Sequence, residues 1–132
     1  MALTICLTKM PGRKLIYKRG EIWWVALDPV VGSETGKERP CLILQNDVGN
    51  KNSDTTVVAP LLPGMKTFPY VVNVLPTSQN RLKGDRHINL GQMRVVDARR
   101  IKNKQGTLED TYWEEIEKAI SIELGFSSAL NR

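Results

Sequence analysis

One arginine stands at the entrance of an apolar run, where it could act on a phosphate group. Arg39 precedes Pro40, which favours an extended backbone, and it follows the polar stretch VVGSETGKE (30–38). A guanidinium is always charged, and its planar fork matches the oxygens of a phosphate. In the same stretch, Ser33 and Glu34 could bind either nucleobases or the neighbouring backbone. A solvated surface arginine is the alternative interpretation of Arg39.

Other residues that could do chemistry form weaker patterns. Cys41 and His87 could in principle act as nucleophile and base, but Cys41 lies in the apolar run CLIL (41–44) and is better interpreted as a core residue. His87 alone is typical of a histidine whose hydrogen bonds are satisfied within a strand. The single histidine, the two cysteines and the scattered acids show no metal-ligand spacing. We therefore expect neither a metal nor a cofactor.

The charge distribution suggests a polyanionic partner. The 132 residues carry a net charge of +5, and the segment 81–104 holds eight of the basic side chains against Asp85 and Asp97. A basic body of this kind is common among proteins that bind nucleic acid, although a merely solvated basic surface is equally compatible with it. No apolar run approaches a bilayer-spanning length, and the N-terminus lacks the order of a signal peptide. We expect a cytoplasmic protein without a membrane segment.

Short strands separated by turn residues dominate the elements that must position these groups. Apolar or alternating runs occur at 21–27, 40–45, 55–62, 68–75 and 87–96, and their close spacing favours a small barrel or sandwich. The segment 46–54 reads as a polar loop. Residues 111–125 show helical periodicity, with capping-box spacing at Thr111 and Glu114 and a stop at Gly125. The pattern predicts one C-terminal helix packed on a β-barrel.

Three motifs in order resemble one protein family. They are RGEIWWVALDPVVGSE (19–34), KERPCLILQNDVGN (37–50) and GQMRVVDARRI (91–101), and together they resemble the MazF/PemK-like toxins of toxin–antitoxin modules. The resemblance runs from Lys18 to about Phe126. It divides the chain into an N-terminal appendage, residues 1–17, and a toxin-like domain, residues 18–132.

The resemblance implies both a fold and an activity. It implies a mainly β, SH3-like small barrel of the CcdB/MazF type with a C-terminal helix, which forms a homodimer. It also implies a sequence-specific, metal-independent endoribonuclease for single-stranded RNA, in which a 2′-hydroxyl attacks the phosphate and leaves a 2′,3′-cyclic phosphate and a 5′-hydroxyl. A cognate MazE-like antitoxin would neutralise it. By the same resemblance Arg39 is the catalytic residue, and Ser33, Glu34 and Gln92 bind RNA.

Two positions depart from the family's pattern. Leu62 stands where many members have a Thr or Ser that assists catalysis, and Gly91 stands where many have an acid. These departures are compatible with altered specificity, with slow cleavage, or with a non-catalytic protein that binds RNA or, like CcdB, acts on gyrase. The resemblance implies an endoribonuclease, and the binding protein remains the alternative.

Overall fold

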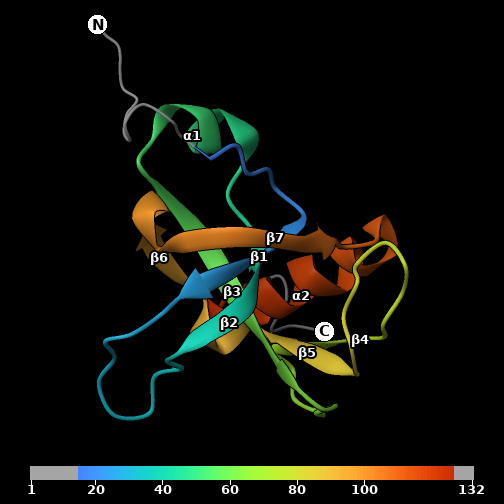
Figure 1. The fold of residues 1–132 in the computed structure, drawn as a ribbon. Coiled ribbons are helices and arrows are strands. Elements are labelled where there is room, and N and C mark those ends of the chain that lie inside the picture. The colour runs from blue at the N-terminus through green and yellow to red at the C-terminus, as the bar shows by residue number, and fades with distance from the viewer. Residues whose placement is uncertain (1–14, 127–132) are drawn as a thin grey trace, which may run out of the picture.

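The computed structural model describes residues 15–126, which form seven strands and two α-helices (Figure 1). In chain order the elements are β1 (Glu21–Ala26), β2 (Glu38–Ile43), α1 (Asp47–Asn52), β3 (Thr55–Pro63), β4 (Val71–Val74), β5 (Arg86–Asn89), β6 (Arg94–Asp97), β7 (Ile101–Thr107) and α2 (Trp113–Glu123). Short 3₁₀ turns at Leu90–Gln92, Ala98–Arg100 and Asp110–Tyr112 link the last elements. Within the described range, no helix has both the length and the apolar character needed to cross a membrane.

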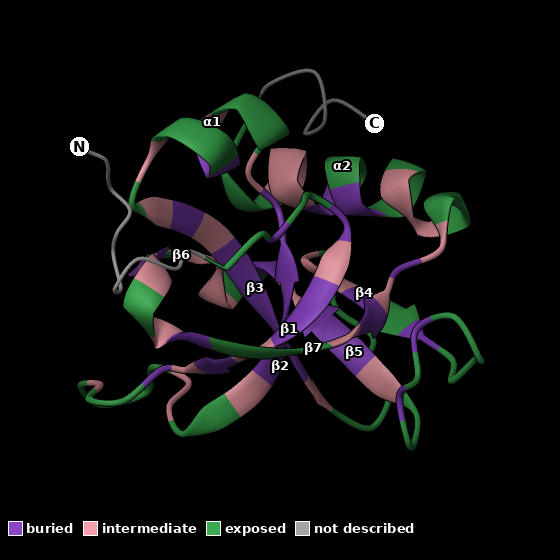
Figure 2. Cartoon of the chain, turned by 45° about the horizontal axis from the view of Figure 1, so that its top comes forward, coloured by how far each residue is buried: buried purple, intermediate pink, exposed green. Residues whose placement is uncertain are grey.

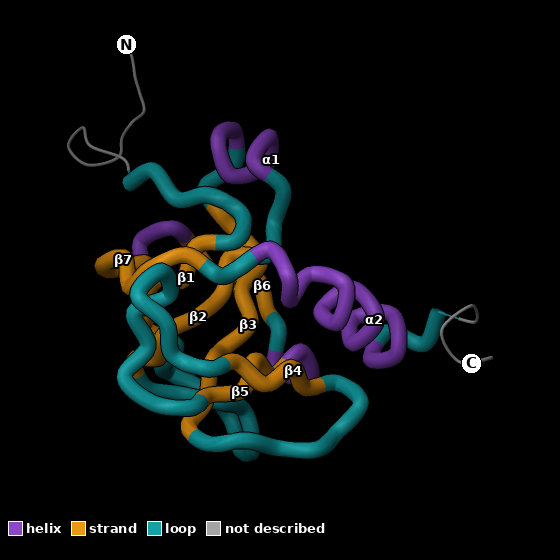
Figure 3. Tube along the Cα trace, turned by 90° about the vertical axis from the view of Figure 1, so that its right-hand side faces the viewer, coloured by secondary structure: helices purple, strands orange, loops and turns teal. Residues whose placement is uncertain are grey.

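All strand pairs are antiparallel, and the sheet runs in the order β4-β5-β3-β2-β1-β7. The long strand β3 organises it, because residues 55–58 pair with β6, residues 58–60 with β2 and residues 61–63 with β5. Helix α2 lies beside the sheet, next to β4 (Figure 3). The predicted architecture, a small β-barrel with one C-terminal helix, is confirmed.

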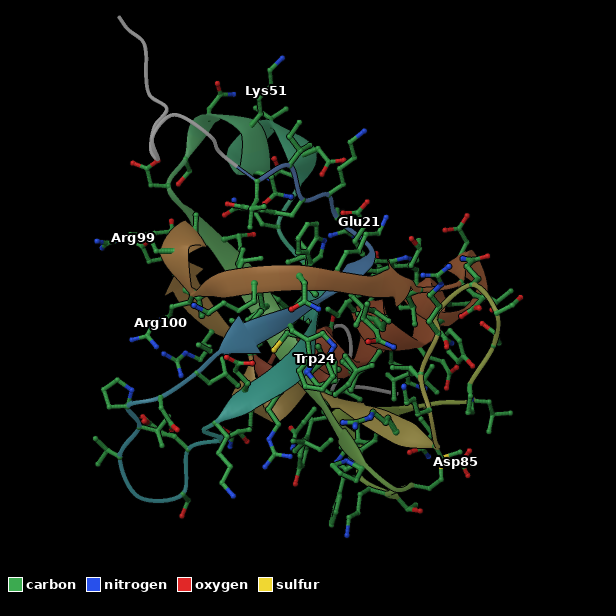
Figure 4. All side chains as sticks on the ribbon, viewed as in Figure 1. Glu21, Trp24, Lys51, Asp85, Arg99 and Arg100 are labelled. Atoms are coloured by element: carbon green, nitrogen blue, oxygen red, sulfur yellow. The ribbon has the colours of Figure 1, made fainter. Side chains whose placement is uncertain are left out.

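The core lies where the strands cross in the middle of the molecule (Figure 2). Alternation along β1 sends Trp23 into one cluster of buried residues, while Trp24 takes the other face and its indole Nε1–H donates to Gln105 Oε1 at 2.8 Å (Figure 4). Cys41 is completely buried in the same cluster as Trp23, so its interpretation as a core residue is confirmed. Residues 1–14 of the expected appendage lie outside the described range, and Tyr17 already packs in this cluster.

Several strand boundaries differ from the sequence prediction. The run 87–96 is not one strand, because a 3₁₀ turn whose start is capped by the Asn89 side chain separates β5 from β6. The run 68–75 contributes only the four residues of β4. Strand β7 was not predicted at all, since its sequence IKNKQGT is polar and only its first and sixth residues are buried.

The predicted polar loop at 46–54 is wrong, because most of it forms helix α1. The Asn46 side chain caps the helix by accepting from the Gly49 N–H at 2.8 Å. Asn50, which is 4% exposed, donates to the Gln45 carbonyl at 3.0 Å and accepts from the Gln45 amide at 3.1 Å and from the Thr56 hydroxyl at 2.7 Å. A satisfied buried amide therefore anchors this helix to β3.

The predicted helix is confirmed as α2, but its predicted capping box is wrong. The residue before the helix, Tyr112, has helical backbone angles and makes no side-chain cap. Packing fixes the helix start instead: the Arg19 guanidinium lies 4.1 Å from the centre of the Trp113 ring, and the Tyr112 hydroxyl accepts from the Leu75 N–H at 3.3 Å. The helix ends where predicted, since Gly125 has a positive φ of 76°.

Candidate active site

Arg39 is the second residue of β2, at the end of the loop that follows β1. This loop, residues 27–37, projects from the body of the molecule (Figure 1). Its base is closed by a hydrogen bond from the Leu27 N–H to the Lys37 carbonyl at 2.8 Å. The Arg39 Nε–H donates to the Gly36 carbonyl at 3.3 Å, and the structure gives its terminal nitrogens no hydrogen bond within residues 15–126. The guanidinium is thus held by the loop and is still able to bind a ligand.

An open pocket of about 420 Å³ lies at Arg39. Its volume falls in the range of about 300–1,000 Å³ that small-molecule sites occupy. Its walls come from β2, from the end of β3 with the connection to β4, and from β5. They comprise Arg39, Leu62, Pro63, Lys66, Phe68, Tyr70, Val71, His87 and Asn89. Two of these side chains are permanent cations at neutral pH and none is a carboxylate, so the pocket suits a phosphate.

Two aromatic rings stack on one wall of the pocket. The ring centres of Phe68 and Tyr70 lie 5.5 Å apart with an angle of 12° between the planes, and Phe68 is 51% exposed. Exposed rings of this kind can stack with the flat faces of nucleobases. The pocket therefore combines cations for a phosphate with an aromatic surface for a base.

Gly91 leaves room for one of these rings. A Cβ at Gly91 would lie 3.0 Å from Tyr70 Cδ1 and 3.1 Å from Asn89 Oδ1, which is closer than packed atoms normally approach. A side chain at this position would press on Tyr70. The glycine at position 91 therefore fits the observed place of the Tyr70 ring in the pocket wall.

Arg86 adds a second guanidinium, and a third cation, close to the pocket. Its Nη1–H donates to the Leu61 carbonyl at 2.9 Å, and both burial and the nearby charge of Arg39 lower its pKa. Two guanidinium groups that repel each other in this way are stabilised when an anion binds between or beside them. The electrostatics favour a negatively charged ligand at Arg39.

Leu62 on β3 and His87 on β5 lie side by side in the pocket lining. They are partners in the β3–β5 register, and both line the pocket with Arg39. His87 is 4% exposed, and its Nδ1 lies 2.9 Å from the Gly64 carbonyl. One of its two ring nitrogens therefore has a hydrogen-bond partner, and no sequence pattern predicts that His87 lies beside Arg39. Only the pairing of β3 with β5 brings the two together.

The other predicted site residues lie in and beside the loop and do not line this pocket. The Glu34 carboxylate accepts from the Val31 N–H at 2.8 Å, which makes it a partner of neighbouring backbone. The Gln92 Oε1 accepts from the Thr35 N–H at 3.0 Å and so ties the loop to the turn before β6. Ser33 is exposed near the middle of the loop. The structure therefore joins Gln92 to the loop of Ser33 and Glu34, next to Arg39 but outside its pocket.

Nucleophilic catalysis by Cys41 does not fit its surroundings. Burial raises the pKa of this thiol to about 12, against a smaller opposing effect of the charges of Arg94 and Arg39. A thiol with this pKa is not a nucleophile near neutral pH. Cys41 also does not line the pocket, although its neighbour Arg39 does. Between residues 15 and 126, no three His, Cys, Asp or Glu side chains are grouped as metal ligands would be.

Comparison with known proteins identifies relatives along most of the chain. The family model described as "PemK-like, MazF-like toxin of type II toxin-antitoxin system" matches residues 18–124. The chain is 34% identical over 111 residues to "Endoribonuclease EndoA" of Bacillus subtilis (strain 168), which covers 83% of this chain and 96% of that relative. It is 36% identical over 112 residues to "Endoribonuclease MazF" of Staphylococcus epidermidis, covering 84% and 93%.

A solved structure supports the same fold. It is described as "Endoribonuclease in complex with its cognate antitoxin from Mycobacterial species" and matches with a TM-score of 0.68 at 20% identity. The match covers 83% of this chain and 96% of the mycobacterial one. The expected SH3-like barrel of the CcdB/MazF type is confirmed.

Proposed function

The chain belongs to the PemK-like, MazF-like toxins of type II toxin–antitoxin systems and is an endoribonuclease, and we propose that it cleaves single-stranded RNA at specific sequences without a metal ion. The observation that carries this proposal is the pocket at Arg39, which offers cations and stacked rings but no carboxylate. These are the groups that bind a phosphate together with its adjacent bases.

The reaction that fits the pocket is attack of a ribose 2′-hydroxyl on the adjacent phosphate. The new bond from the 2′-oxygen to phosphorus displaces the 5′-oxygen, which leaves a 2′,3′-cyclic phosphate and a 5′-hydroxyl. Negative charge builds on the phosphorane oxygens, and the Arg39 guanidinium stabilises that charge. Because the nucleophile belongs to the RNA, the protein has mainly to orient the strand and to stabilise this charge.

Recognition of the RNA sequence would use two neighbouring regions. Phe68 and Tyr70 stack with bases at the scissile phosphate, since their stacked pair lines the pocket. The loop of Ser33 and Glu34, which Gln92 ties to the body of the protein, contacts nucleotides further along the strand. Glu34 and Gln92 use one oxygen each for the loop backbone, so they also fix the shape of the loop.

Membership of a toxin–antitoxin family supports an antitoxin partner for this protein. The mycobacterial neighbour is described in complex with its own antitoxin. For this chain we propose a MazE-like antitoxin whose acidic tail covers the cationic pocket, and a toxin that is a homodimer. The dimer should sediment at twice 14.9 kDa, and a monomer at micromolar concentration would contradict it.

Leu62 is the feature that favours the alternative, a binding protein without catalysis. It lines the pocket and offers no hydrogen bond to a phosphate. The relatives at 34% and 36% identity are named endoribonucleases, however, and they favour the enzyme.

The decisive experiment incubates the purified protein with a long RNA in excess EDTA and maps the new ends. We expect cleavage to survive EDTA and to leave 2′,3′-cyclic phosphate and 5′-hydroxyl ends at a recurrent short sequence. A matched RNA with a 2′-O-methyl group at the mapped position should resist cleavage, because it lacks the nucleophile. A strict requirement for Mg²⁺ or Mn²⁺, or cleavage of the methylated RNA, would contradict the mechanism.

A further inference from the structure

The pocket contains one side chain suited to moving a proton near neutral pH, and it is His87. This residue lies in the middle strand of the β4-β5-β3 part of the sheet, opposite Leu62 on one side and Asn73 on the other. Two strands therefore fix its backbone, and burial fixes its ring. It lines the same pocket as Arg39.

The hydrogen bond of the ring determines which nitrogen can accept a proton. A carbonyl oxygen can only accept, so the Nδ1 that lies 2.9 Å from the Gly64 carbonyl carries a hydrogen and donates it. In the neutral ring Nε2 then holds the free lone pair. This tautomer is the one needed for a base that acts through Nε2.

That second nitrogen has no hydrogen-bond partner among the described residues. Among the described residues, the Tyr17 hydroxyl is the sole side-chain nitrogen or oxygen that is buried without a partner. No hydrogen bond engages His87 Nε2 within residues 15–126, and this nitrogen is not among the described side-chain atoms that are buried without a partner. Since the accessible part of His87 lines the pocket, Nε2 is available to a ligand bound there.

The charged and titratable groups around His87 are mostly cations that attract a phosphate. Arg39 on β2, Lys66 in the β3–β4 connection and Tyr70 before β4 line the pocket with it, and Arg86 precedes it on β5. No carboxylate lines the pocket to compete as a base. The cations keep the site attractive to phosphate, and the imidazole is the group that can take up a proton.

We propose that His87 Nε2 is the general base that accepts the proton of the attacking 2′-hydroxyl, an assignment that rests on the proposed RNA cleavage. As the 2′-oxygen bonds to phosphorus, its proton passes to Nε2 and the bond from phosphorus to the 5′-oxygen breaks. The departing 5′-oxygen takes a proton from water, and His87 then returns its own proton to solvent. No oxidant, metal or second substrate is required.

The test compares His87→Asn and His87→Ala with the unaltered protein in single-turnover cleavage of the mapped RNA from pH 5 to 9. An asparagine amide can take the place of Nδ1 and still donate to the Gly64 carbonyl, but it has nothing at the position of Nε2. We expect both variants to lose about 10²- to 10⁴-fold in rate, the usual contribution of a general base. In the unaltered protein the cleavage rate should rise with pH as an imidazole loses its proton. In both variants this rise should be absent. Added imidazole should partly restore the cleavage rate of His87→Ala. This rescue tests the assignment even if His87→Asn folds poorly.

Binding and folding measurements separate this assignment from a structural role. The affinity of both variants for the 2′-O-methyl RNA should stay within about three-fold of that of the unaltered protein. The melting temperature of His87→Asn should match that of the unaltered protein. Full cleavage by folded His87→Asn, or a rise with pH that persists in His87→Ala, would overturn the assignment while leaving the RNase intact. If the unaltered protein leaves the RNA uncut, the proposed function fails and the base assignment fails with it.

Discussion

At the scale of single residues, Arg39 both forms a hydrogen bond with the loop and lies where it can bind a ligand. Its Nε–H holds the Gly36 carbonyl, and the rest of its guanidinium lies at the pocket. Such a group is fixed before the substrate arrives, so no reorganisation is needed as charge develops. The geometry accounts for why an arginine, rather than a lysine with a single ammonium, suits this position.

Arg39→Ala is therefore expected to slow RNA cleavage by about 10²- to 10³-fold, as the loss of other transition-state donors does. Arg39→Lys should also be impaired, because a point charge does not replace a planar fork. The measurement is the single-turnover rate alongside a thermal melt, with the exposed Lys102→Ala on β7 as the matched control. A normally folded Arg39→Ala that cuts at the unaltered rate would remove Arg39 from the mechanism.

Leu62→Thr is expected to raise the rate by about ten- to a hundred-fold. The new hydroxyl would add one hydrogen bond to a charged phosphate, which is worth roughly 1.5–3 kcal/mol. Leu62→Val is the matched control, because valine has the shape of threonine without the hydroxyl. If the two variants cleave equally, the pocket is already complete without a hydroxyl at this position.

The sequence predicted the candidate residues of the site unevenly, for physical reasons. Arg39 could be found because Pro40 and the apolar run after it mark a strand entrance. His87 could not, since its closeness to Arg39 depends on the pairing of Leu62 with His87, which no local pattern specifies. The role of Gly91 was equally hidden, because it depends on the position of the Tyr70 ring.

At the scale of elements, helix α1 shows how a polar motif can be structural. In QNDVGN (45–50) the side chains of Gln45 and Asn50 form a hydrogen bond with each other. The Asp47 carboxylate accepts from the Arg19 backbone N–H at 2.8 Å. Gly49 has to be small, because a Cβ there would lie 2.9 Å from the Gln45 side chain. The motif therefore holds the connection between β2 and β3 in place and does not itself line the pocket at Arg39.

Asn50→Ala is expected to lower the free energy of unfolding by on the order of 3 kcal/mol. It would leave the buried Thr56 hydroxyl without its acceptor, and an unsatisfied buried group costs about 1–3 kcal/mol. It would also remove one of the two acceptors of the Gln45 amide, which would keep the Thr55 carbonyl. Urea denaturation measures the effect. The exposed Asn52→Ala in the same helix serves as control and should stay within about 0.5 kcal/mol. Equal stability of the two variants would show that this network does not anchor the helix.

The elements that sequence patterns missed are those whose stability comes from distant contacts. Strand β7 has few apolar residues, and its place is set by pairing with β1 and by Gly106, where a Cβ would overlap the Asn80 carbonyl. The capping box predicted at Thr111 and Glu114 is absent because Thr111 lies inside the 3₁₀ turn Asp110–Tyr112, and the helix begins only at Trp113.

At the scale of the whole molecule, much of the basic charge is fixed in place by the backbone. The Arg94 Nη1–H donates to the Leu27 carbonyl at 3.1 Å, and the Arg100 Nη1–H donates to the Ala26 carbonyl at 3.0 Å. Carbonyls do not neutralise a guanidinium, so the positive field persists beside the loop that leads to Arg39. Fixed cations of this kind attract a polyanion from a distance, and salt weakens the attraction.

Acid should destabilise the protein partly through Glu21. Burial alone would raise the pKa of its carboxyl, but hydrogen bonds from Trp23, from Lys104 and from the Lys18 N–H outweigh burial and lower the pKa below its ordinary value of 4.5. A lowered pKa in the folded state means that the stabilisation is complete above pH 4.5 and is lost as the pH falls below it. Urea denaturation at a series of pH values should show this loss.

The matched variants for the acid experiment are Glu21→Gln and Glu117→Gln. The first removes the titrating group and should weaken the dependence on pH below 4.5. The second, on an exposed position of α2, should leave the dependence as it is. An identical acid response in the unaltered protein and in Glu21→Gln would mean that other carboxyls account for it.

The buried thiol of Cys41 allows the rate at which the barrel opens to be measured by chemical labelling. In the closed state the thiol is inaccessible and its pKa is raised to about 12, so an alkylating reagent can modify it only when β2 is transiently exposed. Replacing Cys6 by serine would leave this thiol as the chain's single site of labelling. Because a ligand that binds the closed state suppresses opening in proportion to its occupancy, the labelling rate would report RNA or antitoxin bound at the adjacent Arg39, even when no strand is cut.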